Sequence, residues 1–219
     1  MFIDIEGPLA ILCADVGSVA KGNFGWAGVL VGPEHQDLGS GSDIVRLAET
    51  VADDLNNKVP VALGFEYPLF VPIPQDPARL TSARKNEGQR PWSAGAGSGA
   101  LATGLTETVW LLWHVREQLS SVKIHTRAYL EWSSFAGTGE GLFLWEAFVS
   151  DAGKGKSSTH VGDAEIAVYR FMNSLPNPDE ANAITSDEEV HSLLGAALLR
   201  TGWTTDLTVL SSPCLVIKA

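Results

Sequence analysis

The chain has little cysteine: only Cys13 and Cys214 occur in 219 residues, and both lie in apolar stretches. Two such residues do not make a disulfide framework, so we expect buried free thiols and a reducing compartment. No apolar run approaches the roughly 18 residues that a membrane helix requires. The first residues are acidic, whereas a signal peptide begins with positive charge. These absences predict a cytoplasmic protein that has no membrane partner.

Basic residues are also scarce, because 15 Lys and Arg face 26 Asp and Glu, for a formal net charge of −11. Non-specific nucleic-acid binding depends on neutralising phosphates, so this balance disfavours it while leaving room for a local basic groove. Hydrophobic residues make up 45% of the chain, with seven Trp and eight Phe. That content excludes a disordered chain and supplies a large core. The length suits a single domain over residues 1–219.

Strand and helix patterns alternate along the chain, which indicates an α/β fold with a mixed sheet and helices on both faces. Apolar runs predict strands at residues 8–16, 24–31, 58–66, 122–130 and 207–217, with an extra strand at 142–149. Spacings of three and four residues predict helices at 44–55 after a Ser42 cap, at 98–119, at 161–175 and up to Gly202. The last of these helices is expected to start at a capping box, residues 186–189.

One connection, residues 67–97, is much longer than the usual ~4–6 residues. It holds five of the eleven prolines and four cationic residues. Long connections of this kind are often functional. We therefore expect a loop insertion that acts as a mobile lid and stays outside the core.

Single carboxylates close three of the predicted strands: Asp15, Glu66 and Glu131. Ligands of open α/β sheets bind beyond the carboxyl ends of the strands, so acids delivered there can converge. Converging carboxylates suit hard cations such as Mg²⁺, and metal ions of this kind assist phosphodiester cleavage. The alternative for each acid is a structural role, in which it caps a loop or pairs with an arginine.

Three short motifs carry a resemblance to a known superfamily. Residues 14–18, Ala-Asp-Val-Gly-Ser, precede a glycine turn into Trp26 and resemble the opening of the ribonuclease H-like superfamily. Within it, the chain is most similar to a family of uncharacterised predicted nucleases. Residues 64–69, Gly-Phe-Glu-Tyr-Pro-Leu, resemble the second acidic motif of that family, and residues 129–131, Tyr-Leu-Glu, resemble the third.

The resemblance implies a ribonuclease H-like fold and divalent-metal-dependent phosphodiester hydrolysis. On this basis Asp15 and Glu66 would bind Mg²⁺ or Mn²⁺, and Glu131 would join them as a catalytic residue. The family has an Asp near the start of its last helix, whereas residues 190–193 read Val-His-Ser-Leu here. His191 is our candidate for the missing catalytic group, with the acids at 187 and 188 as alternatives.

Cations cluster in the long connection, which makes it the candidate substrate-binding element. Arg84, Lys85 and Arg90 could bind phosphates while Trp92 stacks on a base, so the expected partner is a nucleic acid or a nucleotide. The alternative is a solvated loop whose cations are balanced by its own acids.

Two rival functions keep the fold and change the activity. Actin-like phosphotransferases also begin with an Asp-x-Gly turn that meets ATP phosphates, as residues 15–17 could, but such proteins normally carry two copies of this core. The second rival is a catalytically inactive ribonuclease H-like protein that binds a partner through the long loop.

Overall fold

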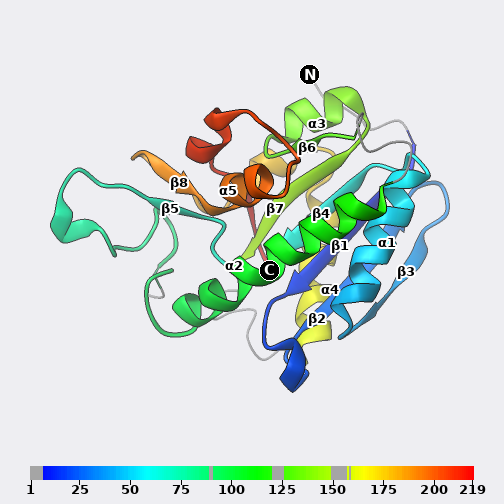
Figure 1. Cartoon of the computed structure of the whole chain (residues 1–219), viewed down its shortest axis with the longest axis horizontal. Helices are drawn as coiled ribbons and strands as arrows, with labels where there is room; N and C mark the ends of the chain where they lie inside the picture. The colour runs from blue at the N-terminus through cyan, green and yellow to red at the C-terminus, as the bar shows by residue number, and fades with distance from the viewer. Residues whose placement is uncertain (1–6, 89–90, 120–125, 149–156, 158) are drawn as a thin grey trace.

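A computed structural model describes residues 7–88, 91–119, 126–148, 157 and 159–219. Its main sheet has seven strands in the order β3-β2-β1-β4-β7-β6, and β9 also pairs with β7 (Figure 1). These strands are β1 (Leu9–Asp15), β2 (Gly25–Val31), β3 (Gln36–Gly41), β4 (Val61–Phe65), β6 (Ala128–Tyr129), β7 (Leu142–Phe148) and β9 (Leu215–Lys218). The helices are α1 (Ile44–Asn56), α2 (Gly95–Gln118), α3 (Trp132–Thr138), α4 (His160–Ser174) and α5 (Leu193–Arg200). The prediction of an α/β fold is confirmed.

The sheet is mixed, as predicted. Strands β1, β2 and β3 are antiparallel neighbours, whereas β4 runs parallel to β1 and β7 runs parallel to β4. Every residue of β1 and β4 is buried. Full burial explains why these two strands are continuous apolar runs in the sequence, since a strand covered on both faces has no polar face.

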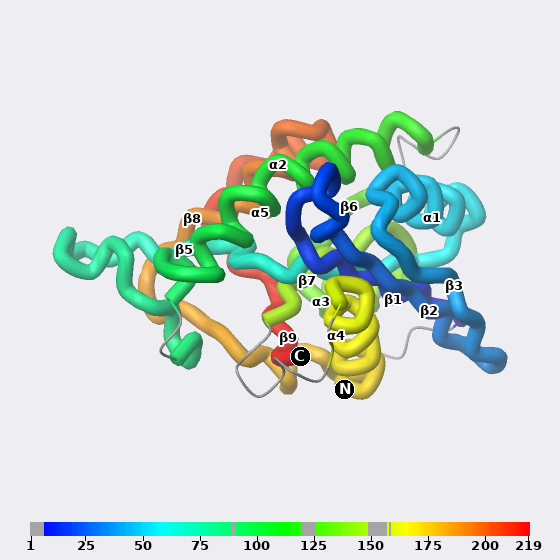
Figure 2. The backbone as a smooth tube through the Cα atoms, turned by 90° about the horizontal axis from the view of Figure 1, so that it is seen from below, coloured from blue at the N-terminus to red at the C-terminus, as the bar shows by residue number. Residues whose placement is uncertain are grey.

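Helices cover both faces of the sheet. Alternate residues of β1, beginning with Ala10, share one core with α1, α2 and α5. The intervening residues, beginning with Leu9, share a second core with α3 and α4. Figure 2 shows α1, α2 and α5 on one side of the strands and α4 on the other. The period of two along each strand thus produces a three-layer arrangement.

Two of the predicted strands differ from expectation in their position in the sheet or in their length. The segment 142–149, predicted as an extra strand, is the interior strand β7, flanked by β4 on one side and by β6 and β9 on the other. The predicted strand 122–130 is represented by β6, of two residues, and residues 120–125 lie outside the described part of the chain. Strand order depends on pairing between distant segments, and local patterns do not report it.

Three predictions of local structure were wrong. Asp43, and not Ser42, caps α1, because its carboxylate accepts hydrogen bonds from the next turn. The expected capping box at 186–189 starts no helix: Ser186 bonds locally to Glu188, and Ser192 caps α5 instead. Only the last part of the predicted strand 207–217 forms β9, since Leu207–Ser211 is a 3-10 helix.

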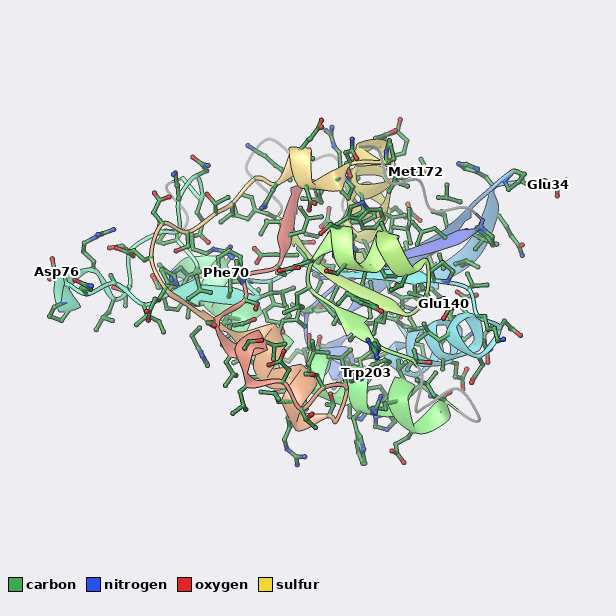
Figure 3. All side chains as sticks on the ribbon, turned by 90° about the horizontal axis from the view of Figure 1, so that it is seen from above. Glu34, Phe70, Asp76, Glu140, Met172 and Trp203 are labelled. Carbon is green, nitrogen blue, oxygen red and sulfur yellow. The ribbon has the colours of Figure 1, made fainter. Side chains whose placement is uncertain are left out.

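The segment 67–97 is not outside the core, contrary to prediction. It contains a short strand, β5 (Phe70–Pro72), which pairs with β8 (Val190–Ser192) in a separate two-stranded sheet. Leu69 and Phe70 are completely buried. Figure 3 shows Phe70 close to the body of the molecule and Asp76 at the outer end of the same segment. We call residues 67–88 the arm.

The two thiols agree with the sequence analysis. Cys13 and Cys214 are free and buried, and burial raises the pKa of each thiol well above its ordinary value. No helix in the described part of the chain is long and apolar enough to cross a membrane.

Candidate functional site

Two of the predicted acids meet where the central parallel strands end. Asp15 is the last residue of β1, and Glu66 directly follows β4. Ala14 lies opposite Phe65 in the parallel register, and the Glu66 amide donates a hydrogen bond to the Ala14 carbonyl at 2.8 Å. Asp15 and Glu66 are therefore neighbours at this edge of the sheet, and their carboxyl groups are close enough to affect each other. This is the convergence that the strand-end pattern predicts.

Helix α4 delivers a histidine to the same place. The ring nitrogen Nδ1 of His160, the first residue of α4, contacts the Asp15 carboxylate in an ion-pair geometry. The position depends on Gly25, which pairs with Asp15 across the β1–β2 hairpin. A Cβ on Gly25 would overlap the backbone of His160 and Val161. A glycine in β2 thus lets the start of α4 approach the strand end.

Two further acids, Asp163 and Glu107, lie near Asp15. Asp163 lies in the first turn of α4, and its charge acts on Asp15. Glu107 of α2 accepts a hydrogen bond from the Gly17 amide at 3.3 Å. Burial, reinforced by the charge of Asp15, raises the pKa of Glu107 to about 7. Negative charge therefore accumulates around the end of β1.

The environment of Asp15 disfavours its ionised form. Its side chain is 10% exposed. Burial raises the pKa of Asp15 to about 6, against the opposing effect of the His160 hydrogen bond. Perturbed carboxyl groups of this kind, placed in a cleft, are characteristic of functional sites.

These residues open into a cleft of about 230 Å³. Its described lining carries five carboxylates against one arginine and one histidine: Asp15, Glu66, Glu87, Glu146, Asp163, Arg84 and His160. The remaining walls come from the arm, from Trp92 just before α2, from the start of α2 and from the end of β7, which includes Phe148. The cleft lining thus combines five carboxylates with apolar and aromatic side chains.

Arg84 does not provide a free cation for phosphates, contrary to prediction. Its side chain is fully buried, and its guanidinium pairs with Glu146 at 2.6 Å and with Glu87 at 2.9 Å. Nη1 also donates to the Phe70 carbonyl at 3.4 Å. Arg84 therefore borders the cleft with its charge compensated by two buried carboxylates.

The other predicted substrate-binding residues lie in different places. Lys85 pairs with Asp187 at 2.8 Å, and both line a separate surface hollow. Trp92 does line the cleft, and its indole nitrogen donates to the Ser82 carbonyl at 3.0 Å. Arg90 lies outside the described residues.

The remaining two predicted catalytic residues do not line the cleft. Glu131 is exposed and accepts a hydrogen bond from Ser134 at 3.2 Å. It lies at the start of α3, two residues after β6, and β6 pairs only with the first two residues of β7, so the chain leaves the sheet before the level of Glu146. His191 is exposed on β8, opposite Val71 of β5. Neither residue lines the cleft with Asp15, because Glu131 lies at the start of α3 and His191 in the separate sheet of β5 and β8.

Local sequence patterns did not indicate His160, Asp163, Glu107 or the two partners of Arg84 as site residues. The available signal was weak: Thr159 precedes a helical pattern and caps α4, which places His160 and Asp163 in its first turn. Nothing local indicates that this turn abuts the end of β1.

Comparison of the chain with protein-family models, with curated protein sequences and with solved structures gave no match.

The donor set of the cleft is compatible with a divalent metal ion. No group of three or more His, Cys, Asp or Glu in the described part of the chain forms a ready metal cage. Mg²⁺ does not require such a cage, since it keeps several waters and is often bound through one or two carboxylates and a substrate phosphate. Asp15 and Glu66 are two adjacent carboxylates in an acidic cleft, which fits that mode of binding.

Proposed function

We propose that the cleft hydrolyses phosphodiesters with the help of Mg²⁺ or Mn²⁺. The observation that carries the proposal is the meeting of Asp15 and Glu66 at the ends of two central parallel strands. Two ionised carboxylates at close range repel each other, and a divalent cation bound between them would neutralise that repulsion. Asp15 and Glu66 are accordingly the proposed metal ligands.

The topology supports a ribonuclease H-like fold, which we include in the proposal. Three antiparallel strands are followed by two strands parallel to the first, and the central order is β3-β2-β1-β4-β7. The resemblance described above expects an acid near the start of the last helix, and α5 has no acid in its first turn. Asp163, in the first turn of α4, is a better candidate for that acid than His191.

Each residue of the cleft has a separate proposed task. Asp15 and Glu66 bind the metal, which would neutralise phosphate charge and lower the pKa of a bound water. His160 holds the Asp15 carboxylate through its Nδ1 contact. Asp163 adds negative charge that favours cation binding. Arg84 keeps the arm against β7 through Glu146 and so maintains one wall of the cleft.

An observation weighs against the phosphotransferase alternative. The turn after β1 would bind ATP phosphates through its backbone amides, but the Gly17 amide already donates to the Glu107 carboxylate. A carboxylate at this position repels a phosphate. The inactive binding protein remains the alternative that experiment must separate from the nuclease.

The test is a pair of measurements on the whole chain with Mn²⁺. Binding to the native state alone stabilises it by about 2.7 kcal/mol at a hundredfold excess over Kd. For a domain of this size we expect Tm to rise by about 5–10 °C. Hydrolysis of bis(p-nitrophenyl) phosphate should appear with Mn²⁺ and cease when EDTA removes the metal.

Two variants test the proposed tasks of Asp15 and Asp163. Asp15→Asn should abolish most of the Tm rise and the hydrolysis while leaving the fold intact, and Asp163→Asn should reduce both. Glu49→Gln removes a charge from the exposed face of α1 and serves as the matched control. If Mn²⁺ raises the Tm of Asp15→Asn as much as it raises the Tm of Glu49→Gln, Asp15 is a structural acid and not a metal ligand.

A further inference from the structure

The cleft is small, and each of its carboxylates is at least partly buried. Its volume is about 230 Å³, and only 10% of the Asp15 side chain is exposed. Tyr67, Pro68 and Phe148 line the walls beside the acids. A phosphodiester therefore has to enter the cleft to reach the carboxylates, because it cannot react from the outer surface.

One wall holds an aromatic ring in a defined position. Trp92 is partly exposed in the cleft, and its indole nitrogen is anchored on the Ser82 carbonyl at 3.0 Å. The first turn of α2 packs against its backbone so closely that a Cβ on Gly97 would lie 3.2 Å from the Trp92 Cα. A ring held in this way loses little conformational freedom when a base stacks on it. Such stacking contributes about 1–3 kcal/mol per base.

The described cations near the cleft do not form a phosphate-binding track. The charge of Arg84 is compensated by Glu87 and Glu146. Lys85 and Arg79 pair with acids and line a separate hollow. Phosphate contacts by Lys and Arg contribute affinity for duplexes and single strands alike, so in the described cleft stacking on Trp92 has to supply binding instead.

We propose that the substrate of this cleft is a phosphodiester next to an unpaired base, as in a dinucleotide or a single-stranded end. This inference rests on the function proposed above. Within a duplex the bases are stacked and paired, so a duplex cannot place a phosphate on Asp15 and Glu66 and a base face on Trp92 together. An unpaired nucleotide can do both, and Trp92 is the residue that selects it.

The experiment compares substrates on the wild-type chain with Mn²⁺. The probes are bis(p-nitrophenyl) phosphate, a dinucleotide, a single-stranded oligonucleotide and the same oligonucleotide annealed to its complement, in DNA and RNA forms. We expect the dinucleotide and the single strand to be cleaved at least tenfold faster than the duplex. Equal or faster cleavage of the duplex overturns the inference, and hydrolysis of bis(p-nitrophenyl) phosphate then still supports the proposed function. Absence of hydrolysis for every probe refutes both.

Variants of the ring test its role separately. Trp92→Leu should lower kcat/KM for the dinucleotide by about 5- to 150-fold, the range that corresponds to the loss of one stacked base. Trp92→Phe keeps a ring and should recover much of that loss. Trp113→Leu removes an exposed tryptophan of α2 outside the cleft and should change nothing. Equal losses in the Leu and Phe variants, or no loss in either, would remove Trp92 from substrate binding.

Discussion

Removal of Arg84 is the most informative perturbation of the fold, because this residue joins the arm to the sheet. Its guanidinium makes two contacts with Glu146, at 2.6 and 2.7 Å, and two with Glu87, at 2.9 and 3.0 Å. All three side chains are essentially inaccessible to solvent. Arg84→Ala would leave two carboxylates buried without their cation.

The expected loss of stability follows from that burial. Breaking a buried ion pair by removing one partner costs about 3–5 kcal/mol, since the remaining charge has neither solvent nor partner. A domain of this size changes Tm by about 2–4 °C per kcal/mol. Arg84→Ala should therefore lower Tm by about 6–20 °C. Urea unfolding followed by tryptophan fluorescence measures the free energy directly.

Two controls separate burial from charge loss. Arg46 pairs with Glu49 on the exposed face of α1, and Arg46→Ala should cost less than about 1 kcal/mol. Hydrogen exchange should show slow exchange of the Arg84 amide, which donates to Glu87 at 2.8 Å, in the wild type and faster exchange in Arg84→Ala. Similar destabilisation by the Arg46 and Arg84 substitutions would refute the argument, and the arm would then be only loosely attached to the sheet.

Three further predictions follow from other parts of the structure. Burial raises the pKa of Asp54 to about 6, and its Oδ2 has no hydrogen-bond partner among the described residues. Ionisation of Asp54 therefore destabilises the folded protein fully above about pH 6. This penalty fades as the pH falls toward about 4, the pKa of an Asp in the unfolded chain. Asp54→Asn should thus stabilise the protein by about 1 kcal/mol at about pH 8, a value reduced to allow for solvent screening, and have little effect near pH 4. Equal changes in the free energy of unfolding in urea at both pH values would contradict this. Gly25→Ala should destabilise the protein by about 1–3 kcal/mol or more, because the new Cβ overlaps the start of α4. Gly99→Ala, at an open position inside α2, should stabilise it by about 0.5–1 kcal/mol. Equal changes in Tm for the two variants would refute the close contact at Gly25. Cys13 and Cys214 should react with Ellman's reagent only after unfolding, because burial raises both thiol pKa values, and rapid labelling of the folded protein would count against their burial.

The sequence alone determined the elements whose signal is local. The continuous apolar runs at 8–16 and 58–66 predicted β1 and β4, because a strand buried on both faces has no polar side. The helical spacings at 44–55 and 161–175 predicted α1 and α4 almost to the residue, because each helix has an apolar face against the sheet. The meeting of Asp15 and Glu66 was also predictable, since parallel neighbours end at the same edge.

Tertiary structure decided the features that depend on pairing between distant segments. The capping box at 186–189 has the right residues for a helix start, but residues 190–192 form β8 against the arm, and this pairing moves the start of α5 to Leu193. Strand pairing also keeps Glu131 away from the cleft, because β6 pairs only with the first two residues of β7 and ends before the level of the cleft.

The chemistry of the cleft shows the same division. Arg84 has the sequence context of a solvent-exposed phosphate ligand, and only the folded chain shows its charge compensated by Glu146, 62 residues away. His160 reaches Asp15 across 145 residues because Gly25 leaves room for the start of α4. Local sequence specifies which side chains can carry charge, whereas the packing of distant segments decides which charges meet and which remain available to a ligand.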